Sequence, residues 1–124
     1  MGTKANFYVG MGPQAEWLGY LQCDGGPDQS HIAKHFKKLP KTARGYRSKV
    51  SRILKDQKSW GASCETPETS ADNLWSTYEY TFHDNQVMVN AFYRQWETLE
   101  HHNSHEYNQN WLDLPRKDIK GRNP

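Results

Sequence analysis

The sequence contains only two cysteines, no long hydrophobic run and none of the short motifs that mark common catalytic sites. Cys23 and Cys64 are too few and too far apart for a disulfide framework or a zinc cluster, so we expect two reduced thiols. No uninterrupted apolar stretch is long enough for a membrane span, and the first ten residues do not resemble a signal peptide. These absences predict a cytoplasmic protein that does not associate with membranes.

The missing catalytic signatures include the GxSxG and P-loop motifs and a cysteine with a histidine beside it in the sequence. Gly10-Met11-Gly12 lacks the third glycine and the following helix of a dinucleotide site. His101 and His105 stand one helical turn apart, a spacing that can chelate a metal, but no third ligand is identifiable. We therefore predict a protein that is not an enzyme, has no cofactor and has no metal site, with this histidine pair as the one metal candidate.

Charged residues make up 24% of the chain, but the two signs of charge are unevenly distributed along it. The segment from His31 to Lys58 carries ten Lys or Arg and one acid, Asp56, which gives it a charge of +9. The rest of the chain has six basic and thirteen acidic residues, a charge of −7, so the net charge of +2 hides the asymmetry. A concentrated positive segment on a mildly negative body is typical of proteins that attract phosphates or an acidic partner.

The clearest structural signal is Leu74 to Arg94, which predicts a β-hairpin. Apolar residues alternate along it, and Asp84-Asn85 tolerates the positive φ of a tight type I′ turn. This turn predicts three cross-strand pairs: Phe82 with Val87, Tyr80 with Val89, and Tyr78 with Ala91. We expect the face that carries Tyr78, Tyr80 and Phe82 to lie against the core.

The other face of this hairpin mixes aromatic, hydroxyl, amide and charged groups. It could be covered by helices, or it could bind a ligand, with Trp75 and Phe92 stacking on a base, Asn90 bonding its edge and Arg94 meeting a phosphate. The full set predicted for this face is Trp75, Thr77, Glu79, Thr81, Met88, Asn90, Phe92 and Arg94.

The chain before this hairpin predicts two strands and two helices. Strands are expected at 6–12 and 16–23, with Trp17 and Leu21 on the same side of the second. A helix capped by Asp28 or Ser30 follows as far as Leu39 and buries a stripe of apolar residues. A second helix, capped by Thr42, extends to Lys58 after Pro40, although Gly45 could delay its start by a residue or two. The two predicted stripes are Ile32, Phe36 and Leu39, and Tyr46, Val50, Ile53 and Leu54.

A basic ridge is expected on the outer side of the second helix, at spacings of three and four residues. It is either a solvated helix face or a surface that contacts phosphates without reading base sequence. Its residues are Arg44, Arg47, Ser51, Lys55 and Lys58.

Together these elements predict a single α+β domain of order ββααββ, in which an antiparallel four-stranded sheet is covered by two helices. Its parts are the first hairpin (1–26), the basic helical pair (28–58), an acidic loop (59–73), the second hairpin (74–94) and a tail (95–124). The tail is expected to hold a short helix carrying Trp96 and Leu99, and its basic end is anchored only if Trp111, Leu112 and Leu114 pack.

Two stretches resemble a group of small, uncharacterised bacteriophage and bacterial proteins. These are NFYVGMGPQAEWLGYLQCDGGPD near the start and TSADNLWSTYEYTFHDNQVMV later on, with a loop tryptophan, Trp60, between them. The group shares an FYVGxGxxAEWLGSxxxDGxP opening and a later aromatic hairpin. The resemblance implies a phage-type accessory protein and assigns no activity to any residue.

The expected function is therefore a binding protein that counters host defence by capturing a phosphate-bearing ligand, either a nucleotide signal or a nucleic acid. One alternative is an inhibitor that docks on a host protein such as a nuclease complex. A virion component or an oligomeric scaffold, with homo-oligomers formed through exposed strand edges, is a further alternative.

Overall fold

The computed structural model describes residues 3–93, 95–104 and 117–122. Within these residues no helix is long and apolar enough to cross a membrane. The elements in chain order are β1 (Ala5–Val9), β2 (Glu16–Leu21), α1 (Ser30–Phe36), α2 (Ala43–Ser59), β3 (Cys64–Glu65), β4 (Tyr78–His83), β5 (Gln86–Ala91), β6 (Trp96–Thr98) and α3 (Leu99–Ser104).

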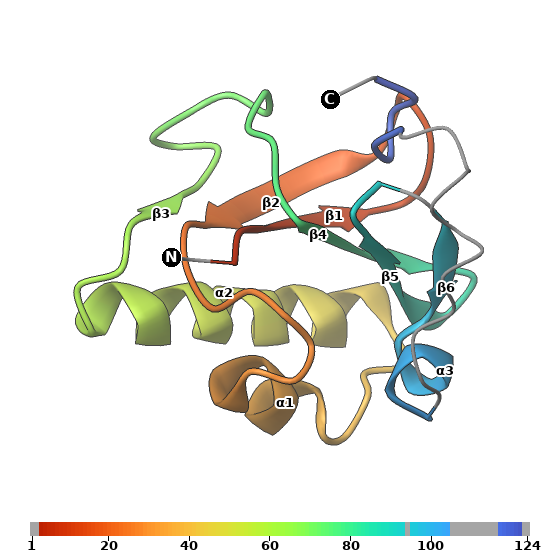
Figure 1. Cartoon of the computed structure of the whole chain (residues 1–124), viewed down its shortest axis with the longest axis horizontal. Helices are drawn as coiled ribbons and strands as arrows, with labels where there is room; N and C mark the ends of the chain where they lie inside the picture. Colours follow the sequence, from red (N-terminus) through yellow and green to blue (C-terminus); the bar gives the residue numbers. More distant parts are fainter. Residues whose placement is uncertain (1–2, 94, 105–116, 123–124) are drawn as a thin grey trace.

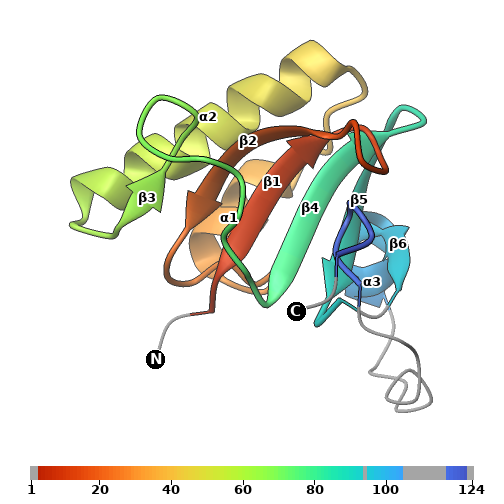
Figure 2. The same cartoon turned by 90° about the horizontal axis from the view of Figure 1, so that it is seen from above.

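The α+β class is confirmed, but the predicted four-stranded antiparallel sheet is wrong. The strands form one six-stranded mixed sheet in the order β3-β2-β1-β4-β5-β6. The two hairpins join through β1 and β4, which run parallel at the centre of the sheet (Figure 2). The additional strands, β3 and β6, are only two and three residues long and extend the outer edges. They were missed because such short segments carry no periodic pattern.

The second hairpin has the predicted register. Phe82 pairs with Val87, Tyr80 with Val89 and Tyr78 with Ala91. Asp84 and Asn85 have φ values of 52° and 61°, as a type I′ turn requires. The hairpin is shorter than expected, because β4 begins at Tyr78 and residues 74–77 are not in a strand.

The first hairpin contains a β-bulge that changes which side chains share a face. Phe7 is opposite Gly19 but Tyr8 is opposite Trp17, so the register shifts between them. As a result Trp17 lies on one face of the sheet and Leu21 in the core on the other, whereas strict alternation predicts them on the same side.

Helices α1 and α2 cover one face of the sheet (Figure 1). The Thr42 hydroxyl caps α2 by accepting a hydrogen bond from the Gly45 amide, so this helix starts at Ala43 despite the glycine. Gly19 allows α2 to approach β2 closely, since a Cβ at position 19 would lie 2.6 Å from Leu54 Cδ1 of the helix. The buried cluster between helices and sheet confirms both stripes except Leu39, which is only partly buried. It contains Ala5, Phe7, Leu21, Ile32, Phe36, Tyr46, Val50, Ile53, Leu54, Tyr80, Phe82, Val87, Val89 and Leu99.

The opposite face of the sheet is covered by chain segments without helices. Segment 66–77 crosses β1, and segment 117–122 lies against β4 and β5. Ile119 joins Tyr8, Trp17 and Tyr20 in a second, smaller apolar cluster there. Part of the basic end of the tail is therefore docked on the sheet, and Trp111, Leu112 and Leu114 lie outside the described residues.

The prediction of a short helix in the tail that carries Trp96 and Leu99 is partly wrong. The first residues of this segment form β6, which pairs with β5, and the helix α3 begins only at Leu99. Leu99 is buried against the core, as expected from its apolar side chain.

Candidate functional site

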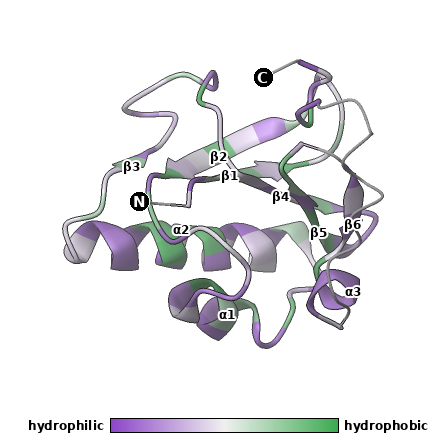
Figure 3. Ribbon diagram, in the orientation of Figure 1, coloured by the Kyte–Doolittle hydropathy of each residue, from purple (hydrophilic) through white to green (hydrophobic). Residues whose placement is uncertain are grey.

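The outer surface of α1, α2 and their connection carries a dense set of positive charges. Nine of its ten basic side chains make no ion pair within the described part of the chain, and all but Lys49 are exposed. Figure 3 shows hydrophilic residues alternating with hydrophobic ones along α2, as an amphipathic helix requires. We call this set the basic surface: Lys34, Lys37, Lys38, Lys41, Arg44, Arg47, Lys49, Arg52, Lys55 and Lys58.

Arg47 is the one member of the basic surface that has a counter-ion in the described part of the chain. Its guanidinium donates two hydrogen bonds of 2.7 Å to the Glu16 carboxylate, which joins α2 to β2. The hydrogen bond from Arg47 lowers the pKa of Glu16. Arg47 was predicted to bind a ligand, but in this structure its charge is already neutralised by a neighbour.

The single acid of the positive segment also has a partner. Asp56 Oδ2 lies 2.7 Å from His35 Nε2, an interaction between α2 and α1 that lowers the pKa of the Asp56 carboxyl. Asp56 is one negative charge beside ten positive side chains, so it reduces the positive field of the segment only a little. The field of the remaining lysines and arginines is left facing solvent.

An open groove lies at the N-terminal end of α2, between the α1–α2 connection and α3. Its volume is about 850 Å³, and it includes the apolar side chains of Phe36, Leu39 and Leu99. Four members of the basic surface surround this apolar lining: Lys37, Lys38, Lys41 and Lys49. The first turn of α2 contains no acidic residue, so the positive end of the helix dipole reinforces the lysines. Glu100 of α3 also lines the groove, so its positive side is the one formed by α2 and the α1–α2 connection. On that side the groove can hold an anion that also has an apolar part.

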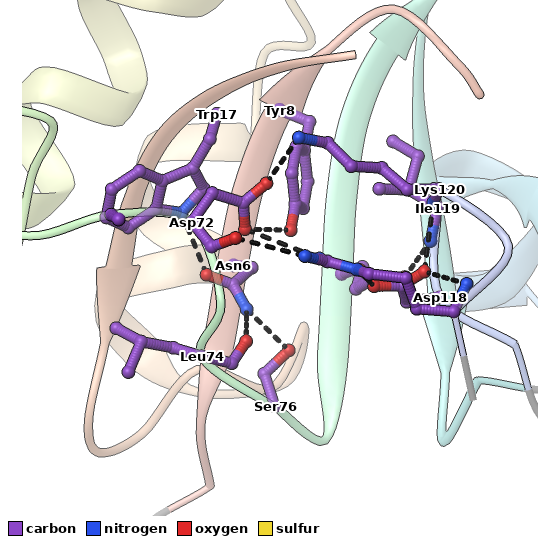
Figure 4. A network of polar contacts seen from close by, with 12 residues as sticks. Asn6, Tyr8, Trp17, Asp72, Leu74, Ser76, Asp118, Ile119 and Lys120 are labelled. Atoms are coloured by element: carbon purple, nitrogen blue, oxygen red, sulfur yellow. Dashed lines mark hydrogen bonds and ion pairs between the residues drawn. The ribbon is translucent and has the colours of Figure 1, made fainter. Parts of the chain in front are cut away.

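The opposite face of the sheet holds a network of buried polar groups (Figure 4). The Asn6 amide donates to the Leu74 carbonyl at 2.6 Å, and its oxygen accepts from Trp17 Nε1 at 2.9 Å. The Tyr8 hydroxyl donates to Asp72 at 2.8 Å, and burial raises the pKa of that hydroxyl. These bonds attach segment 66–77 to β1 and β2.

A second part of this network holds segment 117–122. Glu79 Oε1 accepts a hydrogen bond of 2.9 Å from the Ile119 amide, and Arg122 donates to Asp118 and to the Asp72 carbonyl. Burial, with the nearby Asp118 carboxyl as the next cause, raises the pKa of Glu79 to about 8. The Glu79 side chain is 1% exposed, so its perturbed carboxyl is sealed beneath the segment that it binds.

The residues predicted on the polar hairpin face do not meet in one site. Trp75 is 41% exposed and lies edge-on to Tyr93, with the Arg122 guanidinium over its ring. Asn90 is buried and donates to the Lys117 carbonyl, so segment 117–122 separates it from solvent. Arg94 lies outside the described residues.

Phe92 was predicted on the polar face of the hairpin, together with Trp75, but it lies on the helix side of the sheet. Its φ of 59° interrupts the strand alternation, and its ring contacts Tyr78, which packs against the helix-side core. The sheet therefore separates Trp75 from the basic surface. The exposed residues Arg44, Lys55 and Lys58 cannot act with Trp75 on one small ligand.

The metal candidate remains incomplete. Position 105 lies outside the described residues, and within the described ones no group of three His, Cys, Asp or Glu could hold a metal ion. Cys23 and Cys64 are free thiols, as expected.

Sequence reasoning missed the lysines around the groove as site residues. Lys37, Lys38 and Lys41 were counted only in the charge of the segment, because they lie on either side of Pro40 and not on the outer side of the second predicted helix. The groove also depends on contact with α3 from far along the chain. The dense basic run HFKKLPK was the available signal.

Comparison of the chain with protein-family models, with curated proteins and with solved structures gave no match.

Proposed function

We propose that the chain is a non-enzymatic binding protein that captures a phosphate-bearing ligand on its basic surface. The observation that carries this proposal is the set of nine exposed or groove-lining cationic side chains that have no counter-ion among the described residues. Together with the resemblance to phage-type proteins, it supports a role in the host cytoplasm in which a ligand used by host defence is held out of reach.

Electrostatics supplies most of the affinity in this proposal. Each phosphate neutralised by a lysine or arginine releases counter-ions, so binding weakens steeply with salt and depends little on base sequence. The outer side of α2 carries charged groups and serines, which suit contact with a phosphate backbone rather than with base edges.

The groove adds a place where one ligand group can be oriented. Phe36 and Leu99 offer apolar contact, while Lys37, Lys38, Lys41 and Lys49 surround them with positive charge. A phosphate beside a sugar or a base fits this pairing of apolar and cationic surfaces. Both a free nucleotide and a nucleic-acid terminus have this chemistry.

The test measures binding to both kinds of ligand. Fluorescence anisotropy with labelled 20-nucleotide DNA and RNA, and calorimetry with linear and cyclic nucleotides, would be done at about 50 and 200 mM salt. We expect binding that weakens by at least tenfold at the higher salt concentration. If all titrations are flat at the lower salt concentration, the proposal is wrong.

Charge-reversal variants locate the site. Lys37→Glu and Lys41→Glu change the groove, and Arg44→Glu changes the ridge on α2. Lys117→Glu is the matched control, because Lys117 is exposed on the opposite side of the sheet and the same charge change applies. Loss of affinity in the first three and not in the control supports the proposal, whereas equal losses in all four variants would indicate only a net-charge effect.

A protein partner is the second candidate, because large aromatic side chains are exposed as they often are at protein interfaces. Trp60, Trp75 and Phe92 are 85%, 41% and 37% exposed. An inhibitor of a host nuclease would place the basic surface against an acidic patch of that enzyme. It would be recovered with that enzyme and would show no nucleotide or nucleic-acid binding.

A further inference from the structure

Trp60 differs from the other large aromatic side chains whose exposure the structure describes. It is 85% exposed, whereas Trp75 is 41% exposed and Trp17 is 8% exposed. Burial of a tryptophan side chain is among the largest stabilising contributions that a residue can make. The fold gains almost none of it here, so this ring is available for another contact.

The backbone that carries Trp60 is firmly held. Trp60 is the C-cap of α2, and its amide donates to the Gln57 carbonyl at 3.1 Å. The Gly61 amide donates to Lys58 and the Ala62 amide to Gln57, both at 3.0 Å, while Gly61 adopts the positive φ of 84° that glycine permits at a helix end. The ring therefore projects from a fixed point at the end of the helix.

Cations of the basic surface lie close to Trp60 along α2, although the residue one helical turn before Trp60 is Asp56, which contacts His35. Lys58 is two residues before Trp60 and Lys55 five residues before it, which places them about 3 and 8 Å from Trp60 along the helix axis, within the reach of long side chains. Both lysines are exposed without an ion pair among the described residues. With 17 residues at about 1.5 Å each, α2 extends for about 26 Å from the lysine-lined groove to this aromatic end.

We propose that Trp60 is a stacking platform for an unpaired base, and that the ligand of the basic surface is a single-stranded nucleic acid. This inference rests on the proposed function and names its ligand class. Phosphates of the strand lie against Lys55 and Lys58 while a base stacks on the indole, the combination that sequence-independent single-strand binders use. The internal base pairs of a duplex cannot provide this contact, because the faces of their bases are already stacked on each other.

The test compares one labelled 20-nucleotide oligonucleotide in single-stranded and in duplex form, by anisotropy at about 50 mM salt. Trp60→Ala is expected to weaken single-strand binding roughly 5- to 100-fold and to leave duplex binding unchanged, and Trp60→Phe to retain most of the affinity. Trp75→Ala is the matched control, on the other side of the sheet, and should have no effect. Intrinsic tryptophan fluorescence should be quenched by the single strand in the wild type but much less in Trp60→Phe.

Two results separate this inference from the proposed function. If Trp60→Ala binds both forms as well as the wild type does, while Lys55→Glu and Lys58→Glu weaken both, the stacking inference is wrong and phosphate capture stands. If the wild type binds no oligonucleotide and no nucleotide, both are wrong. Binding of anionic lipid vesicles or of a host protein that requires Trp60, without single-strand binding, would also overturn the inference. Circular dichroism checks folding, which an 85% exposed side chain should not affect.

Discussion

The two faces of the sheet are stabilised by different interactions, although the same strands supply both. Phe7 and Asn6 are neighbours in β1, and both are almost completely buried. Phe7 stacks on Tyr80 at 5.1 Å in an apolar layer beneath α1 and α2, whereas Asn6 holds segment 66–77 by hydrogen bonds. The helix side is stabilised mainly by apolar burial, while the other side depends on a few directed polar contacts.

This difference has a functional meaning for the position of the candidate site. The apolar layer needs only one side of α1 and α2, which leaves their outer side free to carry the basic surface. The polar face is occupied by the chain's own segments. Binding is therefore expected on the helices, and substitutions in the polar face should change stability more than affinity.

Phe7→Ala should give the largest loss, because it leaves a cavity in the apolar layer. We expect unfolding free energy to fall by about 3 to 5 kcal/mol, measured by urea denaturation. The milder Phe7→Leu keeps most of the volume and should remain folded. The control is Phe92→Ala at a 37% exposed ring, with an expected loss below about 1 kcal/mol; an equal loss in both would contradict the contrast between core and surface.

Asn6→Ala tests the polar face. It removes the partner of Trp17 Nε1 and of the Leu74 carbonyl, and the expected loss is about 2 to 3 kcal/mol. Faster amide exchange in segment 66–77 than in α2 should accompany it. Asn73→Ala is the matched control, since Asn73 is exposed, and its effect should stay within about 0.5 kcal/mol.

Glu79 makes stability depend on pH. Its pKa of about 8 in the folded protein exceeds the ordinary value of 4.5, so the folded state retains a proton that the unfolded chain releases. The stabilisation from this group is complete below pH 4.5 and is lost as pH rises toward 8. Relative to Glu79→Gln, the wild type should lose about 1 to 2 kcal/mol between pH 7 and pH 9, measured by urea denaturation. If the unfolding free energies of the wild type and of Glu79→Gln change with pH in parallel, Glu79 does not titrate in this way.

Asp118→Asn should have the smallest effect, about 1 kcal/mol at pH 5, because it weakens the bonds to the Lys120 and Arg122 amides without removing the side chain. It also removes a negative charge that raises the pKa of Glu79, so the pH-dependent loss should shrink. Adding Asp118→Asn to Glu79→Gln should leave the pH profile unchanged. A further change of profile in the double variant would assign the effect to another group.

The parts of the fold that sequence reasoning predicted depend on local patterns. The register of β4 and β5 follows from alternation and from Asp84-Asn85, and α2 follows from the Thr42 cap and its apolar stripe. Two kinds of feature were missed. The parallel pairing of β1 with β4 and the edge strands β3 and β6 arise from distant partners, and the docking of segment 117–122 depends mainly on polar contacts that hydrophobicity patterns do not register.

The candidate site also has some features that could be predicted from local sequence and others that depend on distant residues. Its charge could be counted in the sequence, and the exposure of Arg44, Lys55 and Lys58 follows from helical spacing. The neutralisation of Arg47 by Glu16 joins residues 31 positions apart, and the groove joins the α1–α2 connection to α3. The positive φ of Phe92, which changes its side of the sheet, has no signal in a strand pattern.

The central parallel pair also constrains the order of folding. β1 leaves the ribosome well before its neighbour β4, which begins at Tyr78, so the first hairpin stays without this neighbour while the intervening chain is made. The second hairpin closes locally through a two-residue turn, whereas joining the hairpins closes a loop of many residues, which slows folding. Until then β1 presents an open edge on which a second nascent chain could pair.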